Sequence, residues 1–355
     1  MNIIETHDLC KQYGNALRVA HLDLDVPEGS VYGFLGPNGA GKSTTMNIIT
    51  GFLSATSGTV SIDGYDILND PIKAKSRIGF LPEIPPLYVD MTVREYLDFV
   101  YDLKKTTLPR KPHLDEIVRL VKIDAVQNRL IRNLSKGYRQ RVGIAQALIG
   151  NPDVLILDEP TVGLDPQQII EIRALISKLG KNHTVILSSH ILSEIQAVCE
   201  RIIIINQGYI IADGSTEELS KSISSDNSLI ASIVGPPRQV LPAISAVEGV
   251  RSARVQGVAS GSATEYFIEQ RPDTDTRAAL FDCVVQNGWK MVGLTSGSMS
   301  LEQVFLKLVE MSPEQAAAMF GRQLPEKAGE DSEEKPADNA ADSGDPSDDD
   351  SKKGE

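Results

Sequence analysis

Residues 36–43 of the 355-residue chain carry the sequence GPNGAGKS, which matches the pattern G-x-x-x-x-G-K-[ST]. The apolar stretch SVYGFLG leads into these residues, and the helical pattern KSTTMNIITGF begins at their end. Glycines here allow backbone amides to turn inward around phosphate oxygens, and the dipole at the start of the helix favours the same negative charge. Because the pattern lies between a predicted strand and a predicted helix, it predicts a nucleotide phosphate site.

The residues of this stretch have separate expected roles at the phosphates. The side chain of Lys42 is expected to reach the β- and γ-phosphates, and the hydroxyl of Ser43 is expected to bind Mg²⁺. Thr44 and Thr45 are expected to extend the donors of the first helical turn. The other residues expected to contact the nucleotide through this loop are Gly36, Pro37, Asn38, Gly39, Ala40 and Gly41.

A second stretch, VLILDEP at residues 154–160, predicts the carboxylates of the same site. Its four apolar residues predict a buried strand that delivers Asp158 to the magnesium shell. Glu159 follows at the mouth of this strand, where it is expected to orient the attacking water or accept its proton; the alternative is a carboxylate that only caps the next turn. His190 closes the neighbouring predicted strand TVILSSH and is expected to face the γ-phosphate rather than to be an ordinary packing residue. The predicted catalytic residues are therefore Lys42, Glu159 and His190.

Predicted strands and helices alternate over residues 1–220, which is typical of a mostly parallel α/β core. Helical spacing in TVREYLDFVYDLK and in residues 114–126 predicts a helix-rich insert over about residues 87–150. The other strands expected in this part are IIETHDLC, VAHLDLDV, GTVSIDG and RIIIINQ, the last followed by a hairpin turn at Gln207 and Gly208.

Residues 221–311 follow a different order of strand, helix, strand, strand, helix and strand. This order is typical of a small α+β domain of the split βαβ, ferredoxin-like type. The stretch SLEQVFLKLVEM, residues 300–311, is expected to close this domain as an amphipathic helix. Since no catalytic constellation is visible here, the expected role is regulatory or interaction-forming.

Residues 312–355 are expected to form an acidic disordered tail. Residues 325–355 contain 12 Asp and Glu against 4 Lys, and no aromatic, β-branched or large aliphatic residue. Such a segment cannot bury enough apolar surface to offset the entropy lost on ordering.

The composition of the whole chain excludes several classes of protein. A net charge of −13 argues against a nucleic-acid partner. Cys10, Cys199 and Cys283 are widely separated and form no CxxC pair, which predicts buried free thiols in a reducing compartment. No secretory signal is visible, and the longest aliphatic run, residues 202–205, is far shorter than the ~20 residues of a membrane-spanning helix. The expectation is a soluble chain that reaches a membrane only through a partner.

The stretch LSKGYRQR, residues 134–141, contains no nucleophile, metal ligand or general base. This stretch resembles the signature of the ATP-binding cassette (ABC) ATPases. The stretches described above also resemble motifs of that family and follow one another in the same order, and the resemblance covers residues 1–220. GPNGAGKST then corresponds to the Walker A loop, VLILDEP to the Walker B strand, residues 163–165 to the D-loop and His190 to the switch histidine. Tyr13, in KQYG, matches the aromatic residue that stacks on adenine. The resemblance implies a P-loop NTPase cassette, with a mixed sheet core and a helical subdomain, that uses ATP and Mg²⁺.

The resemblance also gives the signature a purpose. In this family two cassettes face head to tail, and each signature closes over the ATP held by the other cassette. The helix start formed by Ser135, Lys136, Gly137 and Tyr138 would then face the partner's γ-phosphate. The usual signature is LSGGQ, so Lys136 replaces a glycine and Tyr138 a glutamine, and the added positive charge is compatible with phosphate. Because both half-sites are intact in one chain, a homodimer is the simpler expectation.

Glu83, in GFLPEIPPLY, departs from the family in a second place. The family usually has a glutamine here that contacts Mg²⁺ and the attacking water and senses the membrane subunit. A carboxylate can also bind the metal, so the predicted metal-binding residues are Ser43, Glu83 and Asp158. The expected coupling role would be absent if Glu83→Gln changed neither basal nor permease-stimulated ATPase activity.

The resemblance implies an ATPase that energises export through a separate transmembrane permease, which would hold it at the cytoplasmic face of the cell membrane. IGFLPE, SKGYRQR and SLEQVFLKL are similar to cassettes of multidrug, polysaccharide and gliding-motility exporters, and most of all to gliding-motility-associated subunits. One alternative is a soluble ABC-type ATPase acting on a ribosome or DNA complex, against which the single set of motifs and the lack of sustained heptads argue. Another is a nucleotide-dependent binding protein with little hydrolysis, against which Glu159 and His190 argue.

Overall fold

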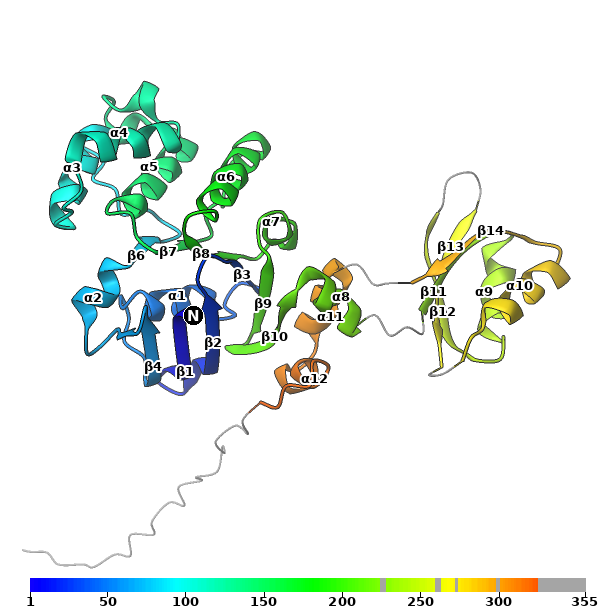
Figure 1. The fold of residues 1–355 in the computed structure, drawn as a ribbon. Coiled ribbons are helices and arrows are strands. Elements are labelled where there is room, and N and C mark those ends of the chain that lie inside the picture. Colours follow the sequence, from blue (N-terminus) through cyan, green and yellow to red (C-terminus); the bar gives the residue numbers. More distant parts are fainter. Residues whose placement is uncertain (224–227, 259–262, 272–273, 298–300, 325–355) are drawn as a thin grey trace, which may run out of the picture. The chain divides into compact units, whose positions relative to one another are not determined.

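The computed structural model describes residues 1–223, 228–258, 263–271, 274–297 and 301–324. The larger of the two sheets in the first part has six strands in the order β10-β9-β3-β8-β7-β6 (Figure 1). All neighbouring strands in it are parallel except the hairpin β9–β10. These strands are β3 (Val31–Leu35), β6 (Ile78–Leu81), β7 (Val154–Asp158), β8 (Thr184–Ser189), β9 (Arg201–Asn206) and β10 (Tyr209–Ser215). Strands β3, β7 and β8 are buried along their whole length, as expected for parallel strands covered on both faces.

The second sheet is antiparallel and has the order β2-β1-β4-β5. Its strands are β1 (Asn2–Tyr13), β2 (Ala16–Pro27), β4 (Ser57–Ile62) and β5 (Tyr65–Asp66). This sheet and helix α1 (Lys42–Ile49) pack against one face of the larger sheet, since Leu22 and Met46 share a buried core with Phe34 and Ile186.

Helices cover the other face of the larger sheet. Leu155 and Val185 share a core there with Ile176 of α6 (Pro166–Leu179) and Ile195 of α7 (Leu192–Gln196). The carboxyl ends of β3, β7 and β8 are neighbours in the sheet. The residues that follow these three strands therefore meet at one edge, which is the usual ligand-binding edge of such sheets.

Between β6 and β7 the chain forms a group of helices. These are α3 (Val93–Leu103), α4 (Arg110–Leu120) and α5 (Lys136–Leu148), with two short 3₁₀ turns, Asp124–Val126 and Ile131–Asn133. A capping box between Thr92 and Glu95 begins α3. All three helices lie within residues 87–150. A further short helix, α2 (Pro71–Ser76), precedes β6.

A third sheet lies in residues 228–296 and is entirely antiparallel, with the order β12-β13-β11-β14. Its elements are β11 (Ser228–Val234), α9 (Pro237–Ser245), β12 (Val250–Val258), β13 (Thr264–Gln270), α10 (Arg277–Gln286) and β14 (Lys290–Ser296). Ile244 of α9 and Leu280 of α10 share its core with Ile233 and Tyr266. This part therefore has a hydrophobic core of its own.

The structure differs from the sequence-based prediction at both ends of this third sheet. Helix α11 (Leu301–Glu310), assigned above to the accessory domain, contacts α8 (Thr216–Ile223), and its apolar stripe lies in the core of the first part of the chain. An amphipathic helix needs an apolar surface to cover, and α11 finds it there. Helix α12 (Pro313–Ala318) then packs on β10, so residues 313–318 are not part of a disordered tail. Helix α12 was not predicted because the residues that it buries include alanines, whose small side chains give only a weak apolar pattern. Residues 325–355 lie outside the described residues.

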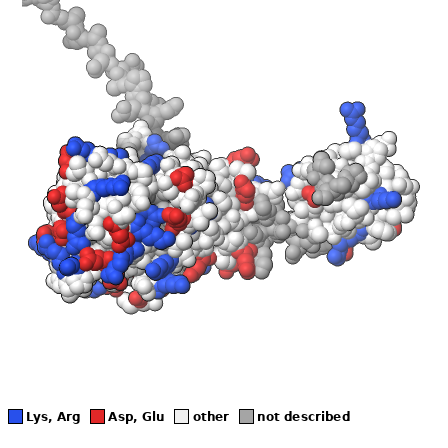
Figure 2. All heavy atoms as spheres, turned by 90° about the horizontal axis from the view of Figure 1, so that it is seen from above, with Lys and Arg blue, Asp and Glu red and all other residues white. Residues whose placement is uncertain are grey.

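No helix in the described ranges is long and apolar enough to cross a lipid bilayer. On the face drawn in Figure 2, basic and acidic side chains are mixed over the first part of the chain. In the helical group, for example, Arg94 pairs with Asp98 at 3.2 Å and with Asp115 at 2.6 Å. The hydrogen bond from Arg94 also lowers the pKa of the Asp115 carboxyl below its ordinary value.

Candidate nucleotide site

The loop of residues 36–41 connects β3 to α1 in a conformation that depends on glycine. Gly41 caps the helix with a φ of 110°, which side chains with a Cβ rarely adopt. A Cβ at Gly36 would clash with the carbonyl oxygen of Ile205 on β9, and one at Gly41 would clash with that of Arg18 on β2. The glycines therefore let this loop pass closely between its neighbours and leave its amides at the start of α1.

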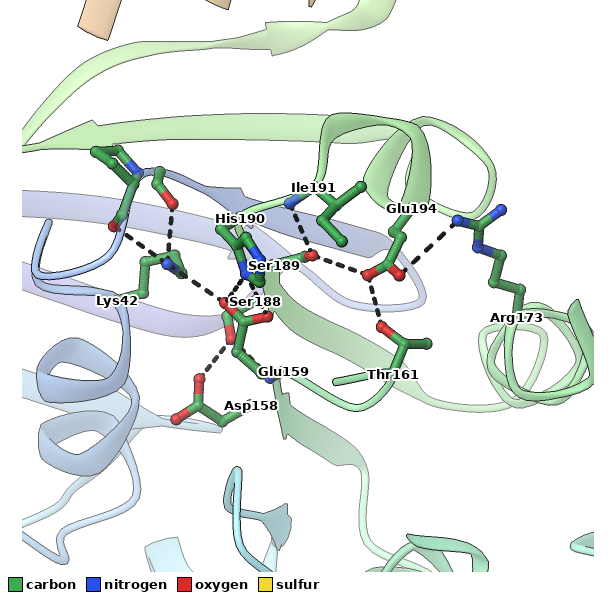
Figure 3. A network of polar contacts seen from close by, with 12 residues as sticks. Lys42, Asp158, Glu159, Thr161, Arg173, Ser188, Ser189, His190, Ile191 and Glu194 are labelled. Atoms are coloured by element: carbon green, nitrogen blue, oxygen red, sulfur yellow. Dashed lines mark hydrogen bonds and ion pairs between the residues drawn. The ribbon is translucent and has the colours of Figure 1, made fainter. Parts of the chain in front are cut away.

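Lys42 is buried, with 5 % of its surface exposed. Its Nζ donates hydrogen bonds to the carbonyl oxygens of Gly36 at 2.9 Å and of Pro37 at 3.3 Å. The same Nζ lies 3.4 Å from Oε1 of Glu159 (Figure 3). The lysine thus folds back over its own loop and places its positive charge between that loop and the strand β7 edge.

Asp158 ends β7 and Ser188 lies opposite it on β8. The hydroxyl of Ser188 donates to Oδ1 of Asp158 and accepts a hydrogen bond of 2.9 Å from the backbone N–H of Glu159. One serine therefore holds both acidic residues of this stretch to the neighbouring strand.

Glu159 has a φ of 47°, which is uncommon for a residue with a side chain and concentrates at functional sites. Glu159 is 6 % exposed, and its carboxylate lies between two nitrogen atoms, Nζ of Lys42 at 3.4 Å and Nδ1 of His190 at 3.1 Å. Figure 3 shows the side chains of Lys42 and His190 next to this carboxylate. The alternative, a carboxylate that only caps the following turn, does not account for these two partners.

A cavity of about 590 Å³ opens in front of these groups. Its lining contains ten of the predicted site residues: Tyr13, Asn38, Gly39, Gly41, Lys42, Ser43, Thr44, Glu83, Glu159 and His190. Arg18 and Val162 also line it, and neither was predicted. Arg18 lies on β2, close to Ala16, which pairs with Tyr13 of β1. A basic residue near the aromatic Tyr13 is the sequence signal from which Arg18 could have been predicted.

Some predicted residues do not line this cavity. Gly36, Pro37 and Ala40 lie in the loop that carries Lys42, and Asp158 accepts a hydrogen bond from Ser188. Thr45 differs from its predicted role because it is fully buried and both its hydroxyl and its backbone N–H donate to the carbonyl oxygen of Gly41 at 2.9 Å. Its donors are used within the helix, as the hydroxyl of a helical threonine often is.

The signature residues line a different cavity, of about 370 Å³. Ser135 caps α5 and accepts a hydrogen bond from the N–H of Tyr138, and both residues line this second cavity together with Gly137. The side chain of Lys136 does not line it. Its Nζ lies so close to Gly163 that an added Cβ there would overlap it. In this conformation the ammonium group of Lys136 therefore lies beside Gly163, and its place near a phosphate of a partner copy stays a prediction.

Glu194 is a buried polar residue next to the site that the sequence did not reveal. Its Oε2 accepts hydrogen bonds from the hydroxyls of Thr161 and Ser189, the latter at 2.9 Å. Its Oε1 lies 4.0 Å from Nη2 of Arg173 (Figure 3). Thr161 and Ser189 stand close in sequence to Glu159 and His190, so Glu194 ties the two loops that carry them. A single glutamate on a short helix offers no pattern from which this could be predicted.

Comparisons with known proteins agree with this geometry. The model of the family described as "ABC transporter" matches residues 19–162. The bacitracin transport ATP-binding protein BcrA of Bacillus licheniformis is 41 % identical over 221 residues, which are 62 % of this chain and 72 % of that protein. The lipopolysaccharide export system ATP-binding protein LptB of Haemophilus influenzae is 36 % identical over 62 % of this chain and 93 % of its own length.

The fold is also similar to a dimeric post-hydrolysis structure of the cassette MJ0796 bound to ADP and Pi, with a TM-score of 0.55 and 26 % identity. The likeness covers 60 % of this chain and 98 % of that one. These relatives are transport proteins, so the alternative of a ribosome- or DNA-directed ATPase is not favoured. The chain therefore belongs to the ATP-binding subunits of the ABC transporters, which hydrolyse ATP to power transport.

Proposed function

We propose that two copies of this chain enclose two ATP molecules, each bound by the larger cavity of one copy and closed by the signature of the other. The observation that carries the proposal is the separation of the two half-sites within one chain. The phosphate cavity and the signature cavity have no lining residue in common. The start of α5, which Ser135 caps, favours a phosphate through the helix dipole but has no nucleotide loop beside it. A second copy supplies that loop.

We propose Mg²⁺ as the companion ion of the nucleotide. The hydroxyl of Ser43 and the carboxylate of Glu83 line the cavity, and Asp158 lies just behind it. These are hard oxygen donors, few in number, which is the set that Mg²⁺ uses together with phosphate oxygens. The ion would neutralise charge that develops on the phosphates during transfer.

Within this site Glu159 is proposed to act on the attacking water. Its carboxylate is fixed by Lys42 and His190 and faces the cavity, so it can accept a proton from water held beside the γ-phosphate. Lys42 would neutralise negative charge on the phosphates. Tyr13 on β1 and Arg18 on β2 would contact the base and the sugar of the nucleotide. His190, 39 % exposed at its side chain, would orient both the carboxylate and the phosphate.

A membrane permease is the proposed partner, and the chain is proposed to lie at the cytoplasmic side of the membrane through it. Ile84, directly after Glu83 in the chain, is 82 % exposed, and Tyr88, five residues after Glu83, is 58 % exposed. The ring of Tyr88 stacks edge-on against Phe99, with centroids 5.3 Å apart. An exposed apolar group beside a cavity residue is suited to transmit a partner's position to the nucleotide. Recovery of the chain only in the soluble fraction of its own cells, without any membrane protein, would contradict this.

Export is the proposed direction of transport. The names of BcrA and LptB refer to bacitracin transport and to lipopolysaccharide export, respectively. The permease, rather than this chain, would select the transported compound. Residues 228–296 are proposed to form a ferredoxin-like accessory domain with a regulatory or interaction role, since their element order and sheet order have that type of connectivity.

The head-to-tail arrangement predicts that two inactive variants restore each other. Lys42→Ala disables the phosphate cavity and Gly137→Asp the signature. In a mixed dimer both changes fall in the same composite site, and the other composite site is intact. An equimolar mixture is therefore expected to regain about a quarter of wild-type ATPase activity, because half of the dimers are mixed and each has one working site.

The measurement is steady-state phosphate release from the separate and mixed proteins. A mixture of Lys42→Ala with Lys42→Ala carrying Gly137→Asp is the control, since no pairing of these two chains produces an intact site. Activity of the first mixture no greater than that of the control would contradict the shared sites.

Replacing Glu83 by glutamine is predicted to weaken the binding of the magnesium ion that the ATPase uses. The amide keeps an oxygen donor but loses the negative charge, so the magnesium concentration for half-maximal activity is expected to rise about tenfold. Turnover at saturating magnesium should change little. Glu116→Gln, on the exposed surface of α4, is the matched control. An unchanged magnesium titration together with unchanged permease stimulation would remove both roles proposed for Glu83.

A further inference from the structure

Three potential metal ligands gather on the hairpin of β1 and β2, outside the nucleotide site. One ligand atom each from Asp8, Cys10 and His21 lies within 4.8 Å of the others. Nδ1 of His21 is 2.5 Å from Oδ1 of Asp8, and the backbone N–H of His21 donates to Sγ of Cys10 at 3.3 Å. Neither the family motifs nor the proposed nucleotide chemistry uses these residues.

Two successive β-bulges bring the three side chains together. On β1, His7 and Asp8 together stand against the single residue Asp23, and on β2, Ala20 and His21 together stand against Cys10. In each pair the second residue, Asp8 or His21, has the left-handed backbone of a bulge. A bulge re-aims the side chain of its extra residue, so Asp8 and His21 both turn toward Cys10. Their φ angles of 49° and 47° lie in the left-handed region, where Asp and His are among the few side chains found.

The bulge on β1 is held in place from its other side. Gly58 of β4 has a φ of 85°, and a Cβ there would clash with the carbonyl oxygen of Asp8. The backbone of β4 therefore packs directly against the bulged residue. Cys10 is buried, with 7 % of its surface exposed, so its sulfur is fixed while the other two ligands face solvent.

The chemistry of the three ligands selects the cation. Mg²⁺ and Ca²⁺ prefer oxygen, whereas a thiolate, an imidazole and a carboxylate are the ligands of Zn²⁺ and its near neighbours. In a tetrahedral zinc site neighbouring ligand atoms stand roughly 3.3–3.7 Å apart, from bond lengths of about 2.0–2.3 Å. The imidazole and carboxylate need to separate by about 1 Å to reach this geometry. They can do so by side-chain rotation, since the two side chains are 36 % and 68 % exposed.

We propose that Asp8, Cys10 and His21 bind a zinc-like divalent cation, with the fourth coordination position open to water. The cation would join β1 to β2 below the end of the hairpin. Tyr13 and Arg18, which line the nucleotide cavity, lie on these same two strands. The site is independent of the proposed transport function and is tested without ATP.

The test is a titration of the purified full-length protein with Co²⁺, which substitutes for Zn²⁺ and reports a thiolate ligand through a charge-transfer band in the near ultraviolet. One equivalent is expected to produce the band, and Zn²⁺ is expected to abolish it by displacement. Cys10→Ser and His21→Ala should each lose the band. Cys283→Ser should keep it, because Cys283 has no such neighbours among the described residues.

Three results would overturn the proposal. They are no thiolate band at stoichiometric Co²⁺, a band that survives Cys10→Ser, and a band unchanged by His21→Ala. Circular dichroism of each variant establishes that it is folded before the titration. If Cys10→Ser does not fold, His21→Ala and protection of the Cys10 thiol from alkylation by Zn²⁺ decide the question, and an unprotected thiol counts against the site.

Discussion

Glu159→Gln is expected to lower ATP turnover at least about 100-fold, because removal of a general base typically has this effect. Glutamine keeps the size and most of the shape of the side chain, but its amide cannot accept a proton from water. It also carries no negative charge toward Nζ of Lys42 and Nδ1 of His190, which lie 3.4 Å and 3.1 Å from the carboxylate. Lys42 then remains free to neutralise the phosphates.

The same substitution is expected to stabilise an ATP-bound dimer. Loss of the carboxylate removes a negative charge from a buried position beside the triphosphate, so ATP binding loses a repulsive contribution. Without hydrolysis the closed dimer is expected to remain closed. Size-exclusion chromatography with ATP and magnesium is expected to show a dimer for Glu159→Gln, and a rapid single-turnover measurement separates binding from chemistry.

Glu116→Gln, at an exposed position on α4, is the control for the substitution itself and should behave as the wild type in both measurements. A monomeric Glu159→Gln protein that holds ATP and turns over at the wild-type rate would contradict both the composite site and the role of the carboxylate.

The meeting of Lys42, Glu159 and His190 at one edge of the sheet could be predicted from the sequence because these residues follow strands with strong local patterns. Lys42 stands in a spaced glycine pattern, and Glu159 follows an apolar run that forms a fully buried strand. The family resemblance then supplied Tyr13, and the cavity includes it. Short-range patterns of this kind depend on neighbours in the chain, which the sequence displays directly.

Other features depend on contacts between distant segments and were not predicted. Helix α11 joins the core of the cassette after an excursion of some 80 residues through the third sheet, and no local pattern indicates such a return. The side chain of Lys136 turns to Gly163, a choice set by the packing of the D-loop rather than by its own helix. The bulges at Asp8 and His21 likewise appear only when the two strands are paired.

Glu194→Ala is expected to reduce both stability and turnover through the two loops that Glu194 connects. The residue is buried at 4 % exposure and accepts from the hydroxyls of Thr161 and Ser189. Alanine leaves both hydroxyls without this acceptor and Arg173 without its nearby carboxylate. The free energy of unfolding is expected to fall by about 2–4 kcal/mol, as for other buried polar groups that lose a partner.

Turnover is expected to fall about 10- to 100-fold in Glu194→Ala, since small displacements of catalytic groups have effects of this size. Thr161 lies two residues after Glu159, and Ser189 directly precedes His190. Ser189 also accepts a hydrogen bond of 3.0 Å from the N–H of Ile191. Without Glu194 to hold Ser189, the turn that carries His190 is expected to become more mobile. Glu194 itself does not line the nucleotide cavity, so KM for ATP should change much less than kcat.

Glu194→Gln separates positioning from simple loss of stability. Thr161 and Ser189 both donate to Oε2, so the amide oxygen of glutamine can still accept both hydrogen bonds, and its volume is nearly unchanged. The variant should therefore lose only about 1 kcal/mol of stability and recover most of kcat. Glu200→Ala, on the exposed surface after α7, controls for removal of a charge nearby. If the alanine variant unfolds at lower denaturant concentration but retains wild-type kcat in its folded range, Glu194 supports the fold alone. If both Glu194 variants lost the same amount of kcat, the negative charge of Glu194 would be what positions Glu159 and His190. Hydrogen-bond acceptance, which glutamine keeps, would then not be enough.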